Sequence, residues 1–485
     1  MPPPVPERLE IVARVCAGGS SAELAALRAE LHKSSPAAAL VDAAIALCAG
    51  DAARADRLLR HAWKAAAPPE RRFVAELWVP ILISMLHFEE AEAILGDERI
   101  DAQDVRFVAL RAVLAATRGD AALSRQLAYD AEERIADDAD EVVRARLHQR
   151  LALAALHRTE PEESLRHAAA AIGIATAARA HRIASSAHSV AYVTHLSITG
   201  DVLAALHHAR EMAASAMVAG DRAFRTAGLV AVYEMLVEMA DDAGAASALE
   251  LLRASPLPEQ FNERFPSRVA DAMVQASGGD FAGARNVFVV LADEENRTPG
   301  ERALCRALAG LCNLGAGDED AARALSRRAI GGTARPPAGL PAYELRYRRL
   351  GRAIGCATCV LLGDTVRADR RSDTAALRVD ADVAGLVDAG RGVPAARLSP
   401  KVRGYARLIE LVHARRAATL SAGPLTATEL EIFRQLDAGR NAPQIAAALG
   451  RSTYTVRTHV RNAIEKLNAR GRLEALARAR KLGLL

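Results

Sequence analysis

Two arginines one helical turn apart, Arg457 and Arg461, are the residues of this sequence best suited to hold another molecule. Their segment, 453–468, also repeats apolar residues at helical spacing, which predicts one buried stripe of Val456, Val460, Ala463 and Leu467. A helix places Arg457, Thr458 and Arg461 on the opposite, exposed face. Arginine donors fit the acceptor edge of guanine and phosphate oxygens. The segment therefore predicts a helix that contacts a nucleic acid.

Shorter elements must position this helix. Helix-capping residues occur at three places: Thr426 with Glu429, Asn441 with Gln444, and Ser452 directly before the arginine-bearing helix. They predict a first helix, a short second helix and the arginine-bearing third helix, and a fourth helix is expected at about 472–481. A short helix, a glycine-containing turn and a longer helix form a helix-turn-helix.

This pattern resembles the C-terminal DNA-binding domain of LuxR-type (GerE-like) transcriptional regulators. The resemblance covers about sixty residues and includes Leu425, Thr426, Glu429, Leu430, Glu431, Gly439, Ile445, Ala446, Leu449, Ser452, Thr455–Asn462, Lys466, Leu467, Arg472, Ala475 and Gly483–Leu485. The sequence departs from the family pattern at 442–444, at Arg451 and at 469–471. The resemblance implies double-stranded promoter DNA as a partner.

The resemblance and the helical geometry agree on which side chains face DNA. The expected base-contacting residues are Arg457, Thr458 and Arg461. The expected phosphate-contacting residues, at the edges of that face, are Thr455, His459 and Lys466. The last helix resembles the one through which the family dimerises, with Leu473, Leu476 and Ala477 as contact residues. We expect a homodimer on an inverted repeat with half-sites roughly 10 bp apart.

The charge distribution supports a polyanion partner at this end of the chain. From Arg397 onward there are 17 Lys/Arg and 6 Asp/Glu, a net of +11, whereas the remainder has 46 basic and 53 acidic residues, a net of −7. A basic segment on a mildly acidic body is typical of a nucleic-acid-binding module.

The rest of the chain predicts packed helices. Alanine is abundant and aromatic residues make up only 4%. Gly-Asp pairs recur between helical stretches, beginning at Gly50, Gly119, Gly200, Gly279, Gly317 and Gly363. Small residues recur 33 to 46 positions apart in the second helix of each unit, as Ala55, Ala91, Ser124, Ser164, Ala205, Ala246, Ala284, Ala322 and Ala368. The spacing resembles a degenerate tetratricopeptide repeat, although an irregular alanine-rich all-α domain remains the alternative.

These observations predict an all-α chain with a tetratricopeptide-like helical array followed by a four-helix LuxR-type domain. The expected parts are a helical-repeat sensor or interaction domain at 1–396, a connecting helix and linker at 397–424, and the helix-turn-helix domain at 425–485. Stacked helix pairs form a concave surface, where we expect the partner site.

Four residues on one expected helix suggest where that site lies. His181, His188 and His195 are seven residues apart, and Tyr192 shares their side. They are candidates for a ligand groove, with metal binding as the alternative, although a seven-residue spacing of about 10 Å is too wide for one ion. Cys356 and Cys359 are interpreted as buried small residues rather than a redox or zinc half-site.

The sequence has no recognisable catalytic or cofactor motif. The sequence contains no Gly-x-x-x-x-Gly-Lys-Ser/Thr phosphate loop, so the ATPase of the large ATP-binding LuxR regulators is not expected. Neither a phosphoryl receiver nor a nucleophile–base–acid set is recognisable. We therefore predict no cofactor, no metal and no enzymatic activity, with an unrecognised all-α active site as one alternative.

The leading hypothesis is a DNA-binding transcription regulator whose helical body senses a peptide, protein or small ligand. The main alternative is a helical scaffold or adaptor with secondary DNA contact. No segment approaches about 20 uncharged apolar residues, and residues 1–6 do not resemble a secretory signal. We expect a cytoplasmic protein that makes no membrane contact. The Arg-rich, Lys-poor composition suggests a high-GC bacterium.

Overall fold

The structure is a computed structural model that describes residues 5–32, 35–135, 140–255, 265–331, 342–364, 385–421 and 425–485. Every regular element in these ranges is helical, which confirms the all-α fold class. The chain divides into two compact units, 1–410 and 411–485, described separately here as the body and the C-terminal unit. In the described ranges, no helix has the length and apolar character needed to cross a membrane.

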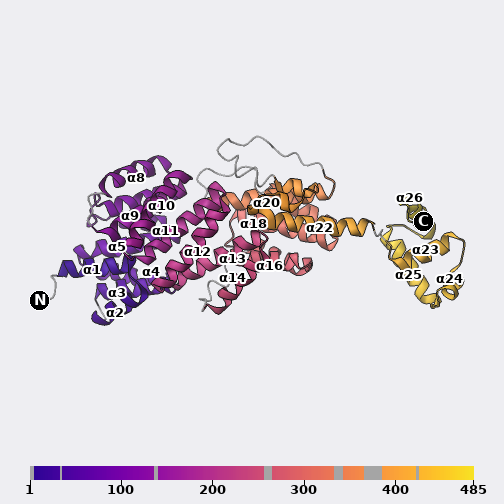
Figure 1. Ribbon diagram of the computed structural model, residues 1–485, viewed down its shortest axis with the longest axis horizontal. Helices are drawn as coiled ribbons and strands as arrows, with labels where there is room; N and C mark the ends of the chain where they lie inside the picture. Colours follow the sequence, from indigo (N-terminus) through magenta and orange to yellow (C-terminus); the bar gives the residue numbers. More distant parts are fainter. Residues whose placement is uncertain are drawn as a thin grey trace. The chain divides into compact units, whose positions relative to one another are not determined.

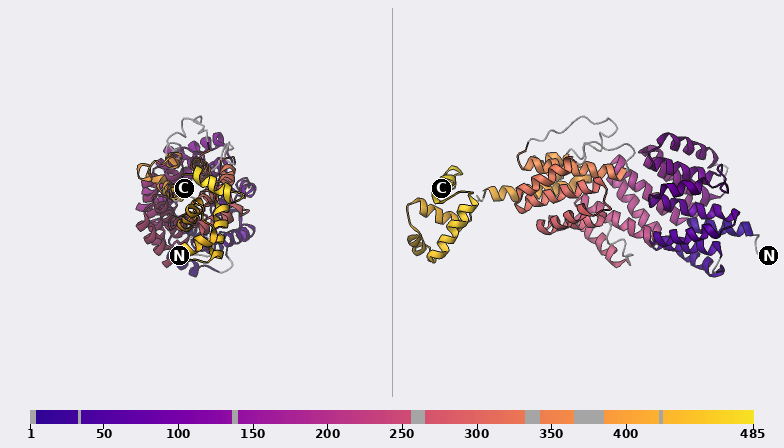
Figure 2. Two further views of the ribbon diagram at one scale, coloured as in Figure 1. Left: turned by 90° about the vertical axis from the view of Figure 1, so that its right-hand side faces the viewer. Right: turned by 180° about the vertical axis from the view of Figure 1, so that it is seen from behind.

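The body is built from helix hairpins that follow one another in sequence order (Figures 1 and 2). It begins with α1 (Val5–Gly18) and α2 (Ser21–Glu30). The hairpins are α3 (Pro36–Cys48) with α4 (Ala52–Ala65), α5 (Pro68–Ser84) with α6 (Phe88–Leu95), α7 (Val105–Thr117) with α8 (Ala121–Ile135), α9 (Glu141–His157) with α10 (Pro161–Ala177), α11 (His181–Thr194) with α12 (Val202–Ala219), α13 (Arg222–Glu238) with α14 (Asp242–Ala254), α16 (Phe265–Ser277) with α17 (Phe281–Asp293), and α18 (Pro299–Ala316) with α19 (Glu319–Gly331). Helix α20 (Ala342–Leu361) packs on α18 and α19.

The recurring Gly-Asp pairs make the hairpin turns as predicted. The five glycines that precede a described second helix, Gly50, Gly119, Gly200, Gly279 and Gly317, have φ between 74° and 94°. Each following aspartate accepts a hydrogen bond of 2.8–3.0 Å from an amide of the next helix. Glycine adopts this left-handed conformation without the steric cost of a Cβ, and aspartate satisfies a free amide. Gly363 has the same geometry, but residues 365–384 lie outside the described ranges.

The small residues of the second helices are buried where the hairpins close. Seven of the nine predicted positions are fully buried: Ala55, Ala91, Ser124, Ser164, Ala205, Ala284 and Ala322. The prediction for Ala246 was wrong by one residue, because Ala246 is exposed and Ala245 packs inward. Ala368 lies outside the described residues. Small side chains at these positions let the paired helices approach closely.

Some hairpin turns place a non-glycine residue in the left-handed conformation, and this predicts a stabilising substitution. Ala240 has φ of 58° between α13 and α14. Ala240→Gly should raise the free energy of unfolding by about 0.5–1 kcal/mol. It removes the steric strain of a Cβ in the left-handed conformation, about 1–2 kcal/mol, and adds a smaller cost in backbone conformational entropy. Gly317→Ala, at φ of 92°, should have the opposite effect. Urea unfolding measures both, and equal midpoints for the two variants would contradict the explanation.

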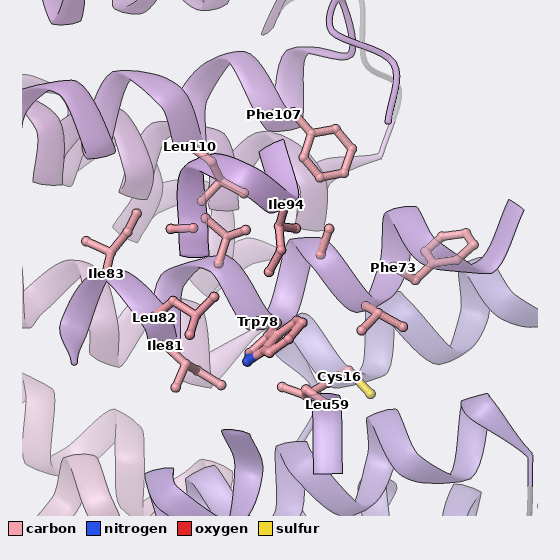
Figure 3. Close-up of a cluster of buried hydrophobic side chains, with 14 of the residues drawn as sticks. Cys16, Leu59, Phe73, Trp78, Ile81, Leu82, Ile83, Ile94, Phe107 and Leu110 are labelled. Carbon is pink, nitrogen blue, oxygen red and sulfur yellow. The ribbon is translucent and has the colours of Figure 1, made fainter. Parts of the chain in front are cut away.

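The N-terminal hairpins share one hydrophobic core (Figure 3). Trp78 lies at its centre among Leu59, Leu82 and Ile94, and its indole N–H donates to Asp56 at 2.7 Å. Helix α1 contacts α3 and α5 and also the distant α9 and α11. The first helix therefore lies against hairpins that are well over a hundred residues away in sequence.

The final body elements lead toward the C-terminal unit. The Pro-rich segments 256–258 and 336–341 lie outside the described residues, as do residues 365–384. Residues 385–390 are helical, and Ser399 and Pro400 start a 3-10 turn, Pro400–Val402. Helix α22 (Arg403–Ser421) follows directly. It includes residues 419–421 of the expected linker, and 422–424 are outside the described ranges.

Candidate nucleic-acid interface

The C-terminal unit contains the four predicted helices. They are α23 (Ala427–Asp437), α24 (Ala442–Ala448), α25 (Thr453–Lys466) and α26 (Arg472–Lys481). The three predicted caps are confirmed: Thr426 with Glu429 and Asn441 with Gln444 form capping boxes, and Ser452 accepts from the amide of Thr455 at 3.1 Å. These caps satisfy amides that would otherwise lack partners at each helix start.

A small core fixes the orientation of α25. Val456, Ala463 and Leu467 are buried, and Val460 packs against the same cluster, which confirms the predicted stripe. Ile432 and Phe433 of α23 and Ile445 of α24 complete the cluster and are fully buried. Helix α25 packs on α23, α24 and α26. Its inner face is therefore held by three helices, and its outer face is left to solvent.

Arg457 and Arg461 lie on that outer face. Both are exposed, and neither forms an ion pair or hydrogen bond with another residue of the described ranges. By contrast, two arginines of α26 are engaged: Arg478 pairs with Glu474 at 2.8 Å, and Arg480 pairs with Asp437 at 2.6 Å. Four residues of helix rise separate the backbone positions of the two arginines by about 6 Å. They are thus two unneutralised cations with all their donors available.

The polar neighbours of these arginines are partly engaged. Thr458 is half-buried, and its hydroxyl donates to the carbonyl of Tyr454 at 3.0 Å, so its oxygen can still accept a hydrogen bond. Thr455 lies at the start of the helix, with its hydroxyl 2.8 Å from that of Ser452. His459 is half-buried on the side of the helix. All three flank the arginine face.

Lys466 is different because it already has a partner. Its ammonium donates to both carboxylate oxygens of Glu429, at 2.9 and 2.7 Å. Glu429 is buried and belongs to the capping box of α23. Burial raises its pKa, but the hydrogen bonds from Lys466 and Thr426 outweigh that effect, and the pKa is lowered overall. An ammonium has three donors, so one remains for a phosphate oxygen.

Comparison with known families identifies this unit. Residues 423–479 match the family described as bacterial regulatory proteins, luxR family. The C-terminal unit is a LuxR-family helix-turn-helix domain. The match covers α23, α24, α25 and most of α26. A comparison of the whole chain with curated proteins finds no match.

Within the LuxR-family domain, the structure adds one exposed residue to the predicted set. Tyr454, in the first turn of α25, is 81% exposed on the side that carries Arg457. Single exposed aromatic rings are common on protein surfaces, so the exposure of Tyr454 does not by itself assign it a contact. Helical periodicity puts Tyr454 on the same outer face, one turn before Thr458.

The three expected dimerisation residues lie on different faces of α26. Leu476 is buried in the domain's own core, whereas Leu473 is 83% exposed and Ala477 is exposed one turn later. Leu482, just after the helix, is also largely exposed. The LuxR-family domain thus presents an apolar strip on its last helix.

The four candidate groove residues of the body have different surroundings. His181 is at the start of α11 near Glu23, and Tyr192 faces Glu234 and Glu238 of α13. His188 and His195 are brought together by a residue of α12: the Nδ1 of His188 is 3.0 Å from that of His208, and the ring of His195 stacks on His208 with centroids 5.5 Å apart. His195 itself lies in a single π-helical turn, His195–Thr199.

The buried histidines predict a loss of stability at mildly acidic pH. Burial, together with neighbouring charges, lowers the pKa of His167 and His188 to about 4. His167 faces His148, Glu132 and Arg166, and His188 faces His207 and His208. The unfolded chain takes up protons near pH 6.5, so each histidine should cost about 2 kcal/mol of unfolding free energy between pH 7 and pH 5.

Urea unfolding at pH 7 and pH 5 tests this dependence. The loss of unfolding free energy from pH 7 to pH 5 is compared between the parent and a variant that carries both His167→Asn and His188→Asn. The carboxylates are the same in both proteins, so their effects cancel in the difference. A larger loss in the parent is expected. Equal losses would show that the two histidines do not become charged on unfolding.

The six cysteines are all buried and free of disulfide bonds. Cys356 and Cys359 lie in α20, and burial raises the pKa of both thiols. Burial therefore disfavours the thiolate, the form that reacts and binds metals. No group of His, Cys, Asp or Glu in the described residues has the arrangement of a metal site.

Proposed function

We propose that this protein is a sequence-specific, DNA-binding transcription regulator. The observation that carries the proposal is the outer face of α25, where Arg457 and Arg461 are exposed and without acidic partners on a helix held by its own core. Arg457, Thr458 and Arg461 are the proposed base contacts, and Thr455, His459 and Lys466 the proposed phosphate contacts. This role needs no cofactor and no catalytic residue.

The body is the proposed sensor. Its consecutive hairpins support a tetratricopeptide-like array at 1–396, joined by residues 397–424 to the DNA-binding domain at 425–485. Such arrays bind peptides, proteins or small ligands on extended surfaces. The alternative, a scaffold whose DNA contact is secondary, shares this body but requires no operator. A bacterial cytoplasm is the proposed location because the partner is promoter DNA.

The regulator is proposed to bind an inverted repeat as a homodimer, and Leu473 tests this. Leu473→Asp should abolish paired half-site occupancy and leave the domain folded, because Leu473 is exposed while Leu476 holds the core. Burying a carboxylate against a second copy would cost several kcal/mol. Gel-shift titration on a two-half-site probe measures the effect, and Leu203→Asp, at an exposed position of α12 in the body, serves as a matched control. Unchanged cooperative binding by Leu473→Asp would rule out this helix as the interface.

Genome-wide footprinting of the full-length protein tests the proposed function. A regulator should protect a small set of promoter sites that share a two-fold symmetric sequence. The genes beside those sites would also indicate the signal. Protection spread evenly over the genome, with no shared sequence, would support the scaffold alternative.

A further inference from the structure

A cavity of about 240 Å³ lies within the N-terminal half of the body. Its walls come from α1, α3, α5, α9, α11 and α13, so it forms where distant hairpins meet. Helix α1 packs against α3, α5, α9 and α11 and therefore forms one side. Pro80 and Ser84 also line the cavity and are exposed, so the cavity reaches the surface beside the end of α5.

Three arginines with little solvent contact line the cavity. The side chains of Arg150 and Arg182 are only 5% and 10% exposed, and Arg146 is one turn from Arg150 on α9. Burial and the neighbouring charges of Arg150 and Arg182 lower the pKa of Arg146. Since guanidinium groups stay charged at neutral pH, the cavity wall carries three cations in a poorly solvated place.

The carboxylates of the wall do not balance these cations. Asp221 lies 3.5 Å from Nε of Arg182, and Glu76 lies 3.2 Å from Arg150. No carboxylate of the described residues pairs with Arg146, whose guanidinium instead donates to the carbonyl of Ala17. Two negative groups therefore face three positive ones.

Hydrogen bonding around the arginines is also incomplete. Among the described residues, the buried Nε of Arg150 has no hydrogen-bond partner, and that of Arg182 has only the ion-pair contact with Asp221 at 3.5 Å. Both terminal nitrogens of Arg150 are engaged: Nη1 donates to the carbonyl of Arg106, and Nη2 donates to the carbonyl and the carboxylate of Glu76. The carbonyl of Glu76 lacks its usual helical donor because residue 80 is proline. Arg150 is thus fixed in place with a buried donor unused, which is costly unless an acceptor is supplied.

The remaining wall is apolar. It is lined by Leu40, Leu47, Phe73, Leu77, Ile81 and Phe224. A cavity of about 150 Å³ accommodates a benzene ring, so 240 Å³ leaves room for a ring that carries one small charged group. The wall would leave most of the surface of inorganic phosphate or sulfate against hydrocarbon, and a peptide segment would be too large.

We propose that this cavity binds a small organic acid, in which one carboxylate is joined to an apolar body about the size of a ring. The carboxylate would meet Arg146, Arg150 and Arg182, and the body would lie against the side chains of Phe73, Ile81 and Phe224. The acid would be the effector of the regulator, so the assignment of its role rests on the proposed function. Its binding is a separate claim that can be measured without DNA.

The test is titration calorimetry of the full-length protein with benzoate, phenylacetate and 3-phenylpropionate. Benzamide, phenylacetamide and 3-phenylpropionamide are the neutral matched controls, because each keeps the shape of its acid and removes the charge. We expect at least one acid to bind and its neutral amide to bind at least tenfold more weakly, since hydrogen bonds to charged groups are the stronger ones. Binding by none of the three acids, or equal binding of acid and amide, would overturn the proposal.

Variants then locate the site. Arg146→Met should abolish binding of the acid while leaving the ligand-free protein as stable as the parent or more stable, because it removes the cation that lacks a carboxylate. Arg210→Met, at an exposed position of α12 outside the cavity, should bind like the parent. Unchanged acid binding by Arg146→Met would place the site elsewhere. If Arg146→Met fails to fold, the acid–amide comparison on the parent still decides the question.

The outcome is separable from the test of the proposed function. If footprinting finds an operator but no acid binds, the regulator stands and the cavity proposal fails. If an acid binds but no operator exists, the cavity proposal stands as a binding site and the regulator proposal fails.

Discussion

Replacing Arg457 or Arg461 with alanine should reduce the preference for the operator over random DNA roughly 5- to 150-fold. Each arginine can form two hydrogen bonds to a guanine, and such a pair contributes about 1–3 kcal/mol of discrimination. Neither residue supports the fold, because both are exposed and without partners in the described residues. Competition binding at one fixed salt concentration measures the preference. Parent-like selectivity of both variants would show that α25 does not read bases.

Lys466→Ala is the informative comparison because it changes a predicted phosphate contact. It should weaken binding to operator and random DNA about equally and lower the salt dependence by about one phosphate contact. It also removes the partner of buried Glu429, so the domain should lose stability. A Lys466→Ala variant that loses selectivity more than Arg457→Ala would reverse the assigned roles.

Arg346→Met should destabilise the body by about 3–5 kcal/mol. Arg346 is buried between α13 and the start of α22, where it pairs with Glu238 and lies 3.9 Å from Glu234. Tyr405 of α22 donates to the other oxygen of Glu238 at 2.7 Å. Without Arg346, the buried Glu238 loses the cation with which it pairs, and removing one partner of a buried pair is costly. Urea unfolding followed by circular dichroism measures the loss.

A double variant separates charge from packing at this site. Arg346→Met combined with Glu238→Gln removes both charges and should recover most of the lost stability, because an uncompensated charge is then no longer buried. Burial and the neighbouring Glu238 raise the pKa of Glu234 to about 8, so Glu234 is largely protonated at neutral pH and adds little charge. A double variant no more stable than Arg346→Met would show that shape, rather than charge, is the main requirement.

Local patterns in the sequence predicted those parts of the structure that depend on local interactions. The Gly-Asp turns, the capping boxes at Thr426 and Asn441 and the buried stripe of α25 each involve residues within a few positions of one another. Helical periodicity likewise placed Arg457 and Arg461 on the outer face. The one-residue error at Ala246 arose because α14 contains several neighbouring small residues, and composition alone could not select Ala245.

The rest depends on contacts between segments far apart in sequence. Glu238 meets Arg346 across 108 positions and Tyr405 across 167, and no local pattern connects them. The cavity arginines were missed for the same reason, since Arg146 and Arg150 lie on α9 and meet Arg182 of α11 only where these two helices pack together with α1. One local signal did exist: Arg150 lies beside Leu147 and Leu151 in a helix whose inner residues, apart from Arg150 and Gln149, are apolar.

The central claim, that this chain reads DNA sequence through α25, is tested most directly by the specificity ratio of the parent protein. The full-length protein is titrated against its footprinted site and against a shuffled sequence of the same length and composition, over a range of salt concentrations. We expect the footprinted site to bind at least about 10³-fold more tightly at physiological salt. A ratio near one at every salt concentration, with both affinities falling together as salt rises, would mean that the arginine face binds only the phosphate backbone and would contradict the account.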